Sequence, residues 1–261
     1  MRITILTPSL NQASFLRPSI ASVLDQIGDF ELNLIVLDGG STDGTVDLLR
    51  SIPDSRLTWT SSPDNGQASA INRGLQSATG DIIGWLNSDD LYLPSALATV
   101  AQAFANPQTQ WLVGRCQIIN ESGTPIRSAI AAYKDHRLGR YSYRKLLREN
   151  FIAQPAVFWR RSLTQQIGGI GGLDESLHYT MDYDLWLRLG RVAPPQIVNQ
   201  ILAQFRLHSA SKSGKLNRAQ FDEGYAVAQR YFEGNPSDRL AHKFNVEKIV
   251  WAYRLMRLLG R

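Results

Sequence analysis

Two adjacent carboxylates, Asp89 and Asp90, follow an apolar segment at residues 82–86 and a short polar turn. No basic residue lies beside them in the sequence, so the pair is costly to bury unless a cation joins it. Mg²⁺ takes oxygen ligands and is often shared between carboxylates and the phosphates of a substrate. The pair therefore predicts a divalent-metal site at the end of a buried strand. The alternative is that one of the two carboxylates caps a helix that begins near Pro94.

Three more polar residues occur where a strand or a helix would place them beside such a site, because ligands of open α/β sheets bind at the carboxyl ends of strands. Asp38 ends an apolar segment and fits either a carboxylate that hydrogen-bonds a base or ribose, or an Asx-turn. Asp182 falls in the first turn of a predicted helix, as a general base or as an acid that meets the helix dipole. His208 ends a strand predicted at 197–205, as a ligand or as a structural histidine.

The elements that must position these residues alternate between strand and helix through about the first hundred residues. Apolar segments predict strands at 3–7, 32–37, 57–60 and 81–86, with helical spacing between them. This order predicts a parallel sheet with helices on both faces. The turn after the first strand, residues 8–12, lacks the glycines of a dinucleotide-binding motif, and the chain has no Gly-Lys-Ser or Gly-Lys-Thr triplet of a P-loop. We therefore expect a mononucleotide-type sheet whose acids face the ligand.

The second half of the chain has a different pattern. Residues 111–113 and 117–119 predict two short strands, in a hairpin or a small mixed sheet. Residues 128–150 are rich in Arg, Lys and Tyr, which fits either a solvated loop and helix or a flap over an anionic ligand. Residues 240–259 form a basic amphipathic helix, which either lies on a membrane surface or packs on its own domain.

Composition limits the classes of protein that fit. The 261 residues are 43% hydrophobic and 20% charged, with a net charge of +5, which favours anionic partners without implying nucleic acid. A single cysteine, Cys116, excludes an internal disulfide. No apolar run approaches the roughly 18 residues of a transmembrane helix, and the first residues do not fit a signal peptide. We expect a soluble cytoplasmic protein.

Several separated motifs together resemble the inverting family 2 glycosyltransferases of the GT-A fold, over about residues 2 to 210. Residues 38–45, DGGSTDGT, are very similar to a loop of that family, and residues 87–90 resemble its metal-binding DxD motif. The other similar segments, in chain order, are residues 7–11, 64–67 with 72–74, 172–175, and 181–186, which resemble the family's ED motif.

The resemblance implies a Rossmann-like α/β fold with a mixed central sheet flanked by helices, plus a C-terminal helical extension. The transferase domain would span 1–210, with a nucleotide-binding half at 1–105 and an acceptor-side half at 106–210, and the extension would span 211–261. The activity would be transfer of a sugar, most often from a UDP-sugar, to a hydroxyl of a glycan or lipid-linked acceptor in surface polysaccharide synthesis. Such an enzyme would work in the cytoplasm or peripherally at the inner face of the plasma membrane, with residues 240–261 touching anionic lipid.

The resemblance also assigns roles to residues. Asp182 would be the catalytic base, and Asp89, Asp90 and His208 would hold Mn²⁺ or Mg²⁺. The nucleotide would be bound by residues from the first four strands and the loops that follow them: Pro8, Ser9, Asp38, Asp64, Gln67, Asn87 and Ser88.

Three departures from the family pattern keep other functions open. Asn87 stands at the first position of the DxD motif, Met181 replaces the usual Glu of the ED motif, and Ser69 stands where relatives often carry Asp. The first two leave room for a catalytically silent module of the same fold that binds nucleotide or glycan. A sugar-nucleotide pyrophosphorylase is a weaker alternative, because that family carries a glycine-rich, basic loop after its first strand.

Overall fold

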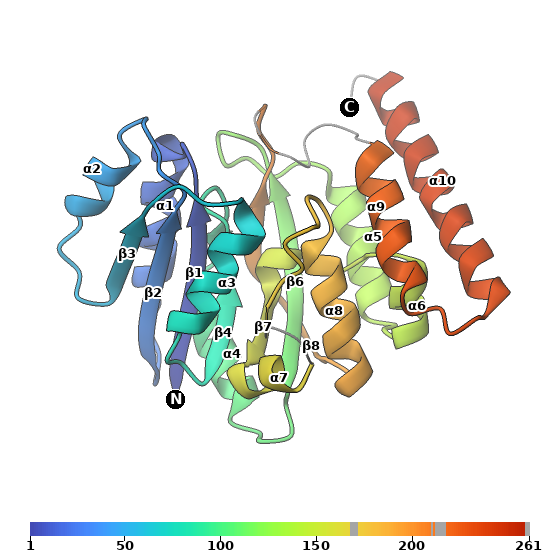
Figure 1. The fold of residues 1–261 in the computed structure, drawn as a ribbon, viewed down its shortest axis with the longest axis horizontal. Helices are drawn as coiled ribbons and strands as arrows, with labels where there is room; N and C mark the ends of the chain where they lie inside the picture. The colour runs from blue at the N-terminus through green and yellow to red at the C-terminus, as the bar shows by residue number, and fades with distance from the viewer. Residues whose placement is uncertain (168–171, 210, 212–217, 259–261) are drawn as a thin grey trace.

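The computed structural model describes residues 1–167, 172–209, 211 and 218–258, with the backbone alone for 252–258. One mixed sheet crosses the molecule in the order β3-β2-β1-β4-β7-β6-β8-β5 (Figure 1). Its strands are β1 Arg2–Ser9, β2 Glu31–Asp38, β3 Leu57–Ser61, β4 Ile82–Trp85, β5 Leu91–Tyr92, β6 Trp111–Ile119, β7 Val157–Arg160 and β8 Gln196–Arg206.

The direction of the strands gathers the predicted site residues at one edge of the sheet. Strands β1 to β4 are parallel to one another, β7 is antiparallel to both β4 and β6, and β8 is parallel to β6. Hence β1, β2, β4, β6 and β8 all point the same way, and their carboxyl ends share an edge. Asp38 ends β2, the segment with Asp89 follows β4, and His208 follows β8, so these distant residues are brought to that edge.

Helices cover both faces of the sheet, as predicted (Figure 1). The helices are α1 Ala13–Leu24, α2 Thr45–Arg50, α3 Gln67–Ser77, α4 Ala96–Phe104, α5 Ser128–Leu138, α6 Tyr143–Arg148, α7 Arg161–Gln166, α8 Met181–Val192, α9 Arg218–Gln229 and α10 Pro236–Leu258, with a 3₁₀ turn at Gln154–Ala156.

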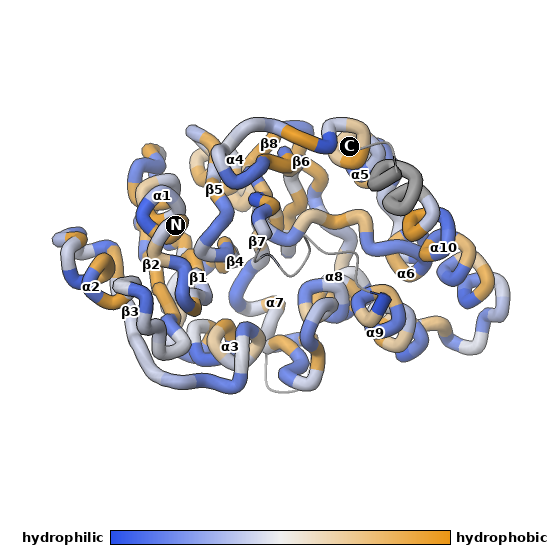
Figure 2. Tube along the Cα trace, turned by 90° about the horizontal axis from the view of Figure 1, so that it is seen from above, coloured by the Kyte–Doolittle hydropathy of each residue, from blue (hydrophilic) through white to orange (hydrophobic). Residues whose placement is uncertain are grey.

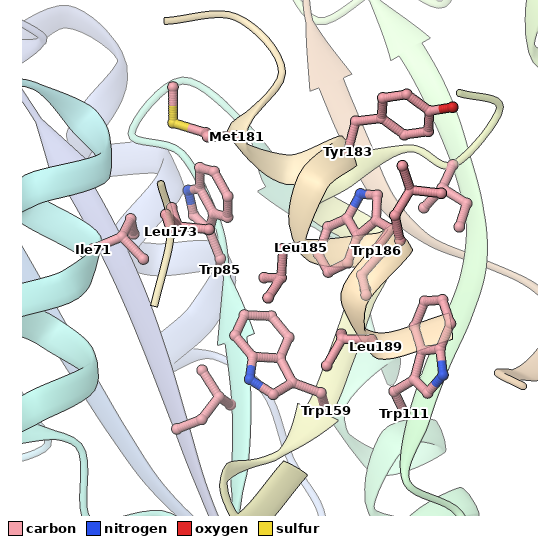
Figure 3. Packing of buried hydrophobic residues seen from close by; sticks show 14 of the residues in the cluster. Ile71, Trp85, Trp111, Trp159, Leu173, Met181, Tyr183, Leu185, Trp186 and Leu189 are labelled. Carbon is pink, nitrogen blue, oxygen red and sulfur yellow. The ribbon is translucent and has the colours of Figure 1, made fainter. Parts of the chain in front are cut away.

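Each strand supplies both apolar layers, because successive side chains point to opposite faces. In β4, Ile82 packs in the layer under α1 and α4, whereas Ile83 and Trp85 pack in the layer that contains α3 and α8. The second layer contains most of the buried indole rings. Trp186 of α8 stacks with Trp111 of β6 at 6.3 Å between ring centroids (Figure 3). Leu185, Trp186 and Leu189 thus fix one face of α8 against the sheet, as the helical spacing predicted.

The prediction of two short strands, at residues 111–113 and 117–119, is wrong. The chain runs through them as the single strand β6, Trp111–Ile119, which pairs with β7 on one side and with β8 on the other. Its register with β8 shifts on both sides of Arg115, so the strand is irregular between the two predicted segments without being interrupted. The turn that follows forms only an isolated bridge between Ile119 and Pro125.

The last two helices, α9 and α10, pack beside α6 and α8 (Figure 1). Arg144 and Arg148 of α6 both donate to Asp238 Oδ1 in the first turn of α10, at 2.9 and 2.6 Å. Residues 210 and 212–217, near the predicted start of the C-terminal extension, and 259–261 lie outside the described residues. Within the described part, no helix is both long and apolar enough to span a membrane.

Candidate active site

A cleft of about 1310 Å³ opens at the carboxyl edge of the sheet. Its lining comes from both halves of the chain, with the loops after β1, β4 and β8 on one side and α5, α8 and the inner face of α10 on the other. Of the predicted site residues, those that line it are Pro8, Ser9, Asp64, Gln67, Asn87, Ser88, Asp89, Asp182 and His208. Asp38 and Asp90 lie beneath this surface, and both are fully buried.

Asp38 is enclosed by its own loop. Its carboxylate accepts hydrogen bonds from Gly40 N at 3.1 Å, Ser41 N at 2.9 Å and Ser61 Oγ at 2.6 Å, and also from Ser41 Oγ. This geometry favours the Asx-turn that the sequence left open, because the carboxylate holds the glycine-rich loop in place. Direct contact between Asp38 and a nucleotide base stays a prediction.

The hydrogen bonds of Asn87 explain why an amide stands where the family motif has an acid. Its Oδ1 accepts from Gln67 Nε2 at 2.8 Å and from Trp85 Nε1 at 2.9 Å. Its Nδ2 donates to Gln154 Oε1 at 3.1 Å and to Asp90 Oδ2 at 3.3 Å. A carboxylate has no N–H to donate, so Asp at this position could make only the first two bonds. Asn87 therefore joins α3, β4 and the turn at Gln154, and Asp89 is the acid of residues 87–90 that lines the cleft.

Asp89 and His208 form a close pair at the cleft wall. Asp89 Oδ2 lies 3.0 Å from His208 Nε2, and the Asp89 side chain is 17% exposed. Arg206 Nε donates to the Asp89 backbone oxygen at 2.8 Å, and the ring of Phe15 packs against that of His208 with 4.6 Å between centroids. A carboxylate and an imidazole at this spacing suit a cation that completes its shell with phosphate oxygens, as Mn²⁺ and Mg²⁺ do. In the described part of the chain, no group of three or more metal-binding side chains gathers, so protein ligands alone would leave the shell incomplete.

Asp90 supports this loop from below. Its Oδ1 accepts from Arg206 N at 2.8 Å, which ties the loop after β4 to the end of β8. Burial and the neighbouring Asp89 charge raise the pKa of Asp90 well above its usual range. The first turn of α4 shows no side-chain cap, so the helix-cap alternative for Asp89 and Asp90 is wrong.

Asp182 lies in the first turn of α8 and is half-buried at the cleft wall. Its Oδ1 accepts a hydrogen bond from Tyr183 N at 2.7 Å. Burial raises the pKa of Asp182 to about 6, against the lowering effects of that N–H and of the Lys134 charge. A carboxyl group with this pKa is ionised at neutral pH and still basic enough to accept a proton.

The residues that hold the approach to Asp182 carry no clear signal in the sequence. Glu223 of α9 accepts from the backbone N–H groups of His178, Tyr179 and Thr180, at 2.9, 2.8 and 2.7 Å. No motif marks this residue. Asn72 of α3 is different, because it belongs to the segment 72–74 that resembles the family. Its side chain bonds both Leu173 N and Leu173 O, and a Cβ on Gly172 would clash with it.

The fold, a mixed sheet with helices on both faces, is that of the GT-A transferases. Residues 4–168 match the model of the family described as Glycosyl transferase family 2. The chain therefore belongs to glycosyl transferase family 2, which confirms the family, the fold and the transferase class expected from the sequence.

Similar proteins agree with this assignment. A relative described as an uncharacterized glycosyltransferase of Rickettsia felis is 26% identical over 223 residues, which cover 82% of this chain and 36% of the relative. This chain thus spans about a third of that protein. S. aureus TarS 1-349 in complex with UDP-GlcNAc has a TM-score of 0.68 at 14% identity, over 92% of this chain and 69% of TarS. The mannosyltransferase PcManGT from Pyrobaculum calidifontis, in complex with GDP-Man and Mn²⁺, has a TM-score of 0.67 at 19% identity, over 92% of this chain and 68% of that one.

Proposed function

We propose that this chain is a metal-dependent inverting glycosyltransferase, which moves a sugar from a nucleoside-diphosphate sugar to a hydroxyl of a glycan or lipid-linked acceptor. The proposal rests on one observation: the Asp89–His208 pair and Asp182 line the same cleft. A leaving diphosphate and an attacking hydroxyl need these two kinds of group in one space. The Asp89–His208 pair suits the leaving diphosphate through the cation that it would hold, and a carboxylate of raised pKa suits the attacking hydroxyl.

The donor nucleotide would lie on the wall formed by the end of β1, the segment from β3 to the start of α3, and the loop after β4. Pro8, Ser9, Asp64, Gln67, Asn87 and Ser88 line that wall. Asp64 is held toward it by Arg73, whose Nη2 donates at 3.1 Å, so its position is set before any ligand arrives. The neighbours with bound UDP-GlcNAc and GDP-Man support a nucleoside-diphosphate sugar as donor. We propose a UDP-sugar as the donor, because the family that the sequence resembles most often uses UDP-sugars.

Asp89 and His208 would hold the Mn²⁺ or Mg²⁺, and PcManGT was solved with Mn²⁺. The bound cation would supply positive charge against the leaving diphosphate. Asp182 would accept the proton of the acceptor hydroxyl as its oxygen attacks the anomeric carbon. The bond from that carbon to the diphosphate breaks on the opposite side, so a single displacement inverts the anomeric configuration.

A donor screen tests this function directly. UDP-, GDP- and dTDP-sugars are incubated with the protein and Mn²⁺, and release of the nucleoside diphosphate is measured with and without EDTA. We expect release from one nucleotide class, which EDTA stops and added Mn²⁺ restores. Transfer that retains the anomeric configuration, or equal release in EDTA, would contradict the proposed chemistry.

The raised pKa of Asp182 predicts an acid limb in the pH profile. A base works only when deprotonated, so kcat/KM should fall about tenfold for each pH unit below a midpoint near 6. The measurement is kcat/KM between pH 4.5 and 8 at saturating metal. A midpoint close to the ordinary aspartate value of 3.8 would show that burial does not tune this carboxyl group.

We also propose that α10 rests on an anionic membrane surface, where a lipid-linked acceptor would be reached. Leu240, Phe244 and Trp251 are 74%, 70% and 65% exposed, and at about 100° per residue they share one narrow stripe of the helix. Figure 2 shows the hydrophobic and hydrophilic residues that alternate along α10. Lys243 and Lys248 flank the stripe, and the one acid beside it, Glu247, is bonded by Arg218 at 2.9 Å. Apolar side chains next to cations match the surface of an anionic bilayer.

Replacing Leu240, Phe244 and Trp251 together with Gln should weaken binding to vesicles that contain an anionic phospholipid at least about tenfold, because the apolar side chains no longer enter the bilayer. The assay is co-sedimentation with anionic and with purely zwitterionic vesicles. Ile27, which is 86% exposed outside α10, provides the matched control as Ile27→Gln. If the triple variant binds as well as wild type, the stripe has another role.

A further inference from the structure

Helix α5 forms a wall of the cleft with one of its faces. Arg127, at its N-terminal boundary, and Ile130, Ala131 and Lys134 all line the cleft, at the i, i+3, i+4 and i+7 spacing of a single helical face. Leu138 is the only fully buried residue of α5. The helix thus contributes little to the core and presents one face, with a cation at each end, to the cleft.

Most basic side chains of this cleft already have partners. Arg148 donates to Asp238, His208 pairs with Asp89, and His242 bonds the backbone oxygen of Leu147. Lys134 is different, because it makes no hydrogen bond or ion pair with any residue that the structure describes. The residue is partly buried, and its side chain lines the cleft.

Lys134 lines the same cleft as Asp182, which is the proposed base on the acceptor side. Its charge acts on Asp182 and on Cys116, which lies in β6 at the cleft wall. The ammonium and the Asp182 carboxylate do not form an ion pair, although both residues line the same cleft. The diphosphate of the donor has its own proposed partner in the cation that Asp89 and His208 would hold, which leaves Lys134 for a second anion.

We infer that Lys134 binds an anionic oxygen group, a phosphate or a carboxylate, that the acceptor carries close to its accepting hydroxyl. This inference rests on the proposed function, because it is the role of Asp182 as base that places the hydroxyl. With the hydroxyl at Asp182, the next part of the acceptor reaches the α5 wall. An ammonium there forms a charge-assisted hydrogen bond with such a group, whereas a neutral acceptor would leave it without a partner. The substrate class is therefore an acidic or phosphorylated acceptor.

The chain has six lysines, so the state of each ammonium can be followed by NMR after reductive ¹³C-methylation. The Lys134→Arg variant assigns the signal of Lys134. Inorganic phosphate is titrated into protein saturated with UDP and Mg²⁺, at constant ionic strength kept with chloride. Lys145 is the internal control, because its ammonium is bonded to Arg140 O and does not line the cleft. We expect a saturable shift of the Lys134 signal at least about five times that of Lys145.

Two outcomes overturn the inference. If phosphate moves the Lys134 signal no more than that of Lys145, the cleft has no second anion site at α5. If UDP binding itself saturates the response and phosphate adds nothing, Lys134 serves the donor diphosphate. The Lys134→Gln variant separates these cases by calorimetry, because we expect it to keep UDP affinity within about twofold, and a loss above tenfold would assign it to the donor. A protein that binds no nucleotide refutes the proposed function instead, and phosphate binding at Lys134 is then measured without UDP.

Discussion

Replacing Asp182 with Asn is expected to lower kcat by about 10² to 10⁴, the usual contribution of a positioned general base. Asn has nearly the same shape but accepts no proton at neutral pH, so the acceptor hydroxyl must attack without losing its proton to the enzyme. The hydrogen bond from Tyr183 N at 2.7 Å can be kept by the amide oxygen. UDP affinity should therefore stay within about threefold of wild type, which separates a chemical defect from a binding defect.

Asp184 provides the matched control for this variant, because it lies in the same helical turn and faces away from the cleft. Its carboxylate is bonded to Arg188 Nε and to Tyr231 OH, both at 2.8 Å, and it is almost fully buried. Asp184→Asn removes a charge from a buried ion pair and should lower the free energy of unfolding. The folded enzyme should keep kcat within about threefold. Equal loss of activity in both variants would mean that Asp182 acts through the fold of α8 and is not the base.

The two neighbouring acids after β4 are expected to respond differently to the same substitution. Asp89→Asn should weaken UDP binding in Mn²⁺ at least about a hundredfold, or roughly 2.7 kcal/mol. The physical reason is that a neutral amide is a poor substitute for a carboxylate as a ligand of a hard cation. The measurement combines UDP titration with the spin-resonance signal of free Mn²⁺, which disappears when the ion is bound.

Asp90→Asn tests the opposite prediction one residue further along the chain. Asp90 is fully buried and accepts from Arg206 N at 2.8 Å, a bond that an amide oxygen can keep. We expect Mn²⁺ and UDP affinity within about fivefold of wild type. If Asp90→Asn loses the metal while Asp89→Asn keeps it, the assignment of the cleft ligand is reversed.

The sequence predicted the part of the site that depends on strand ends. An acid or a histidine directly after an apolar strand falls at the carboxyl edge, and the parallel direction of β1, β4 and β8 then brings Asp89 and His208 together. The rule requires only that each strand is recognised and that its direction is known. The pairing of residues 119 positions apart therefore followed from short local patterns together with the family resemblance.

The sequence did not predict what depends on side-chain orientation or on contacts with distant elements. Asp38 and Asp90 follow the same strand-end rule as Asp89, yet their side chains turn into the protein, where neighbouring N–H and hydroxyl groups enclose them. The amide N–H of Asn87 is needed for its hydrogen bond to Gln154, which lies 67 residues away in the sequence. Glu223 belongs to a helix with no motif, and only the packing of α9 against α8 places it beside residues 178–180.

Calorimetric titration of UDP into the wild-type protein, in Mn²⁺ and then in EDTA, tests the proposed donor site most directly. We predict binding in Mn²⁺ that is at least about a hundredfold tighter than in EDTA, because the Asp89–His208 pair and the diphosphate complete the metal shell together. Equal affinity in the two conditions would contradict the role of the metal. No binding of UDP, GDP or dTDP in either condition would contradict the proposed function of the cleft as a nucleotide-sugar site.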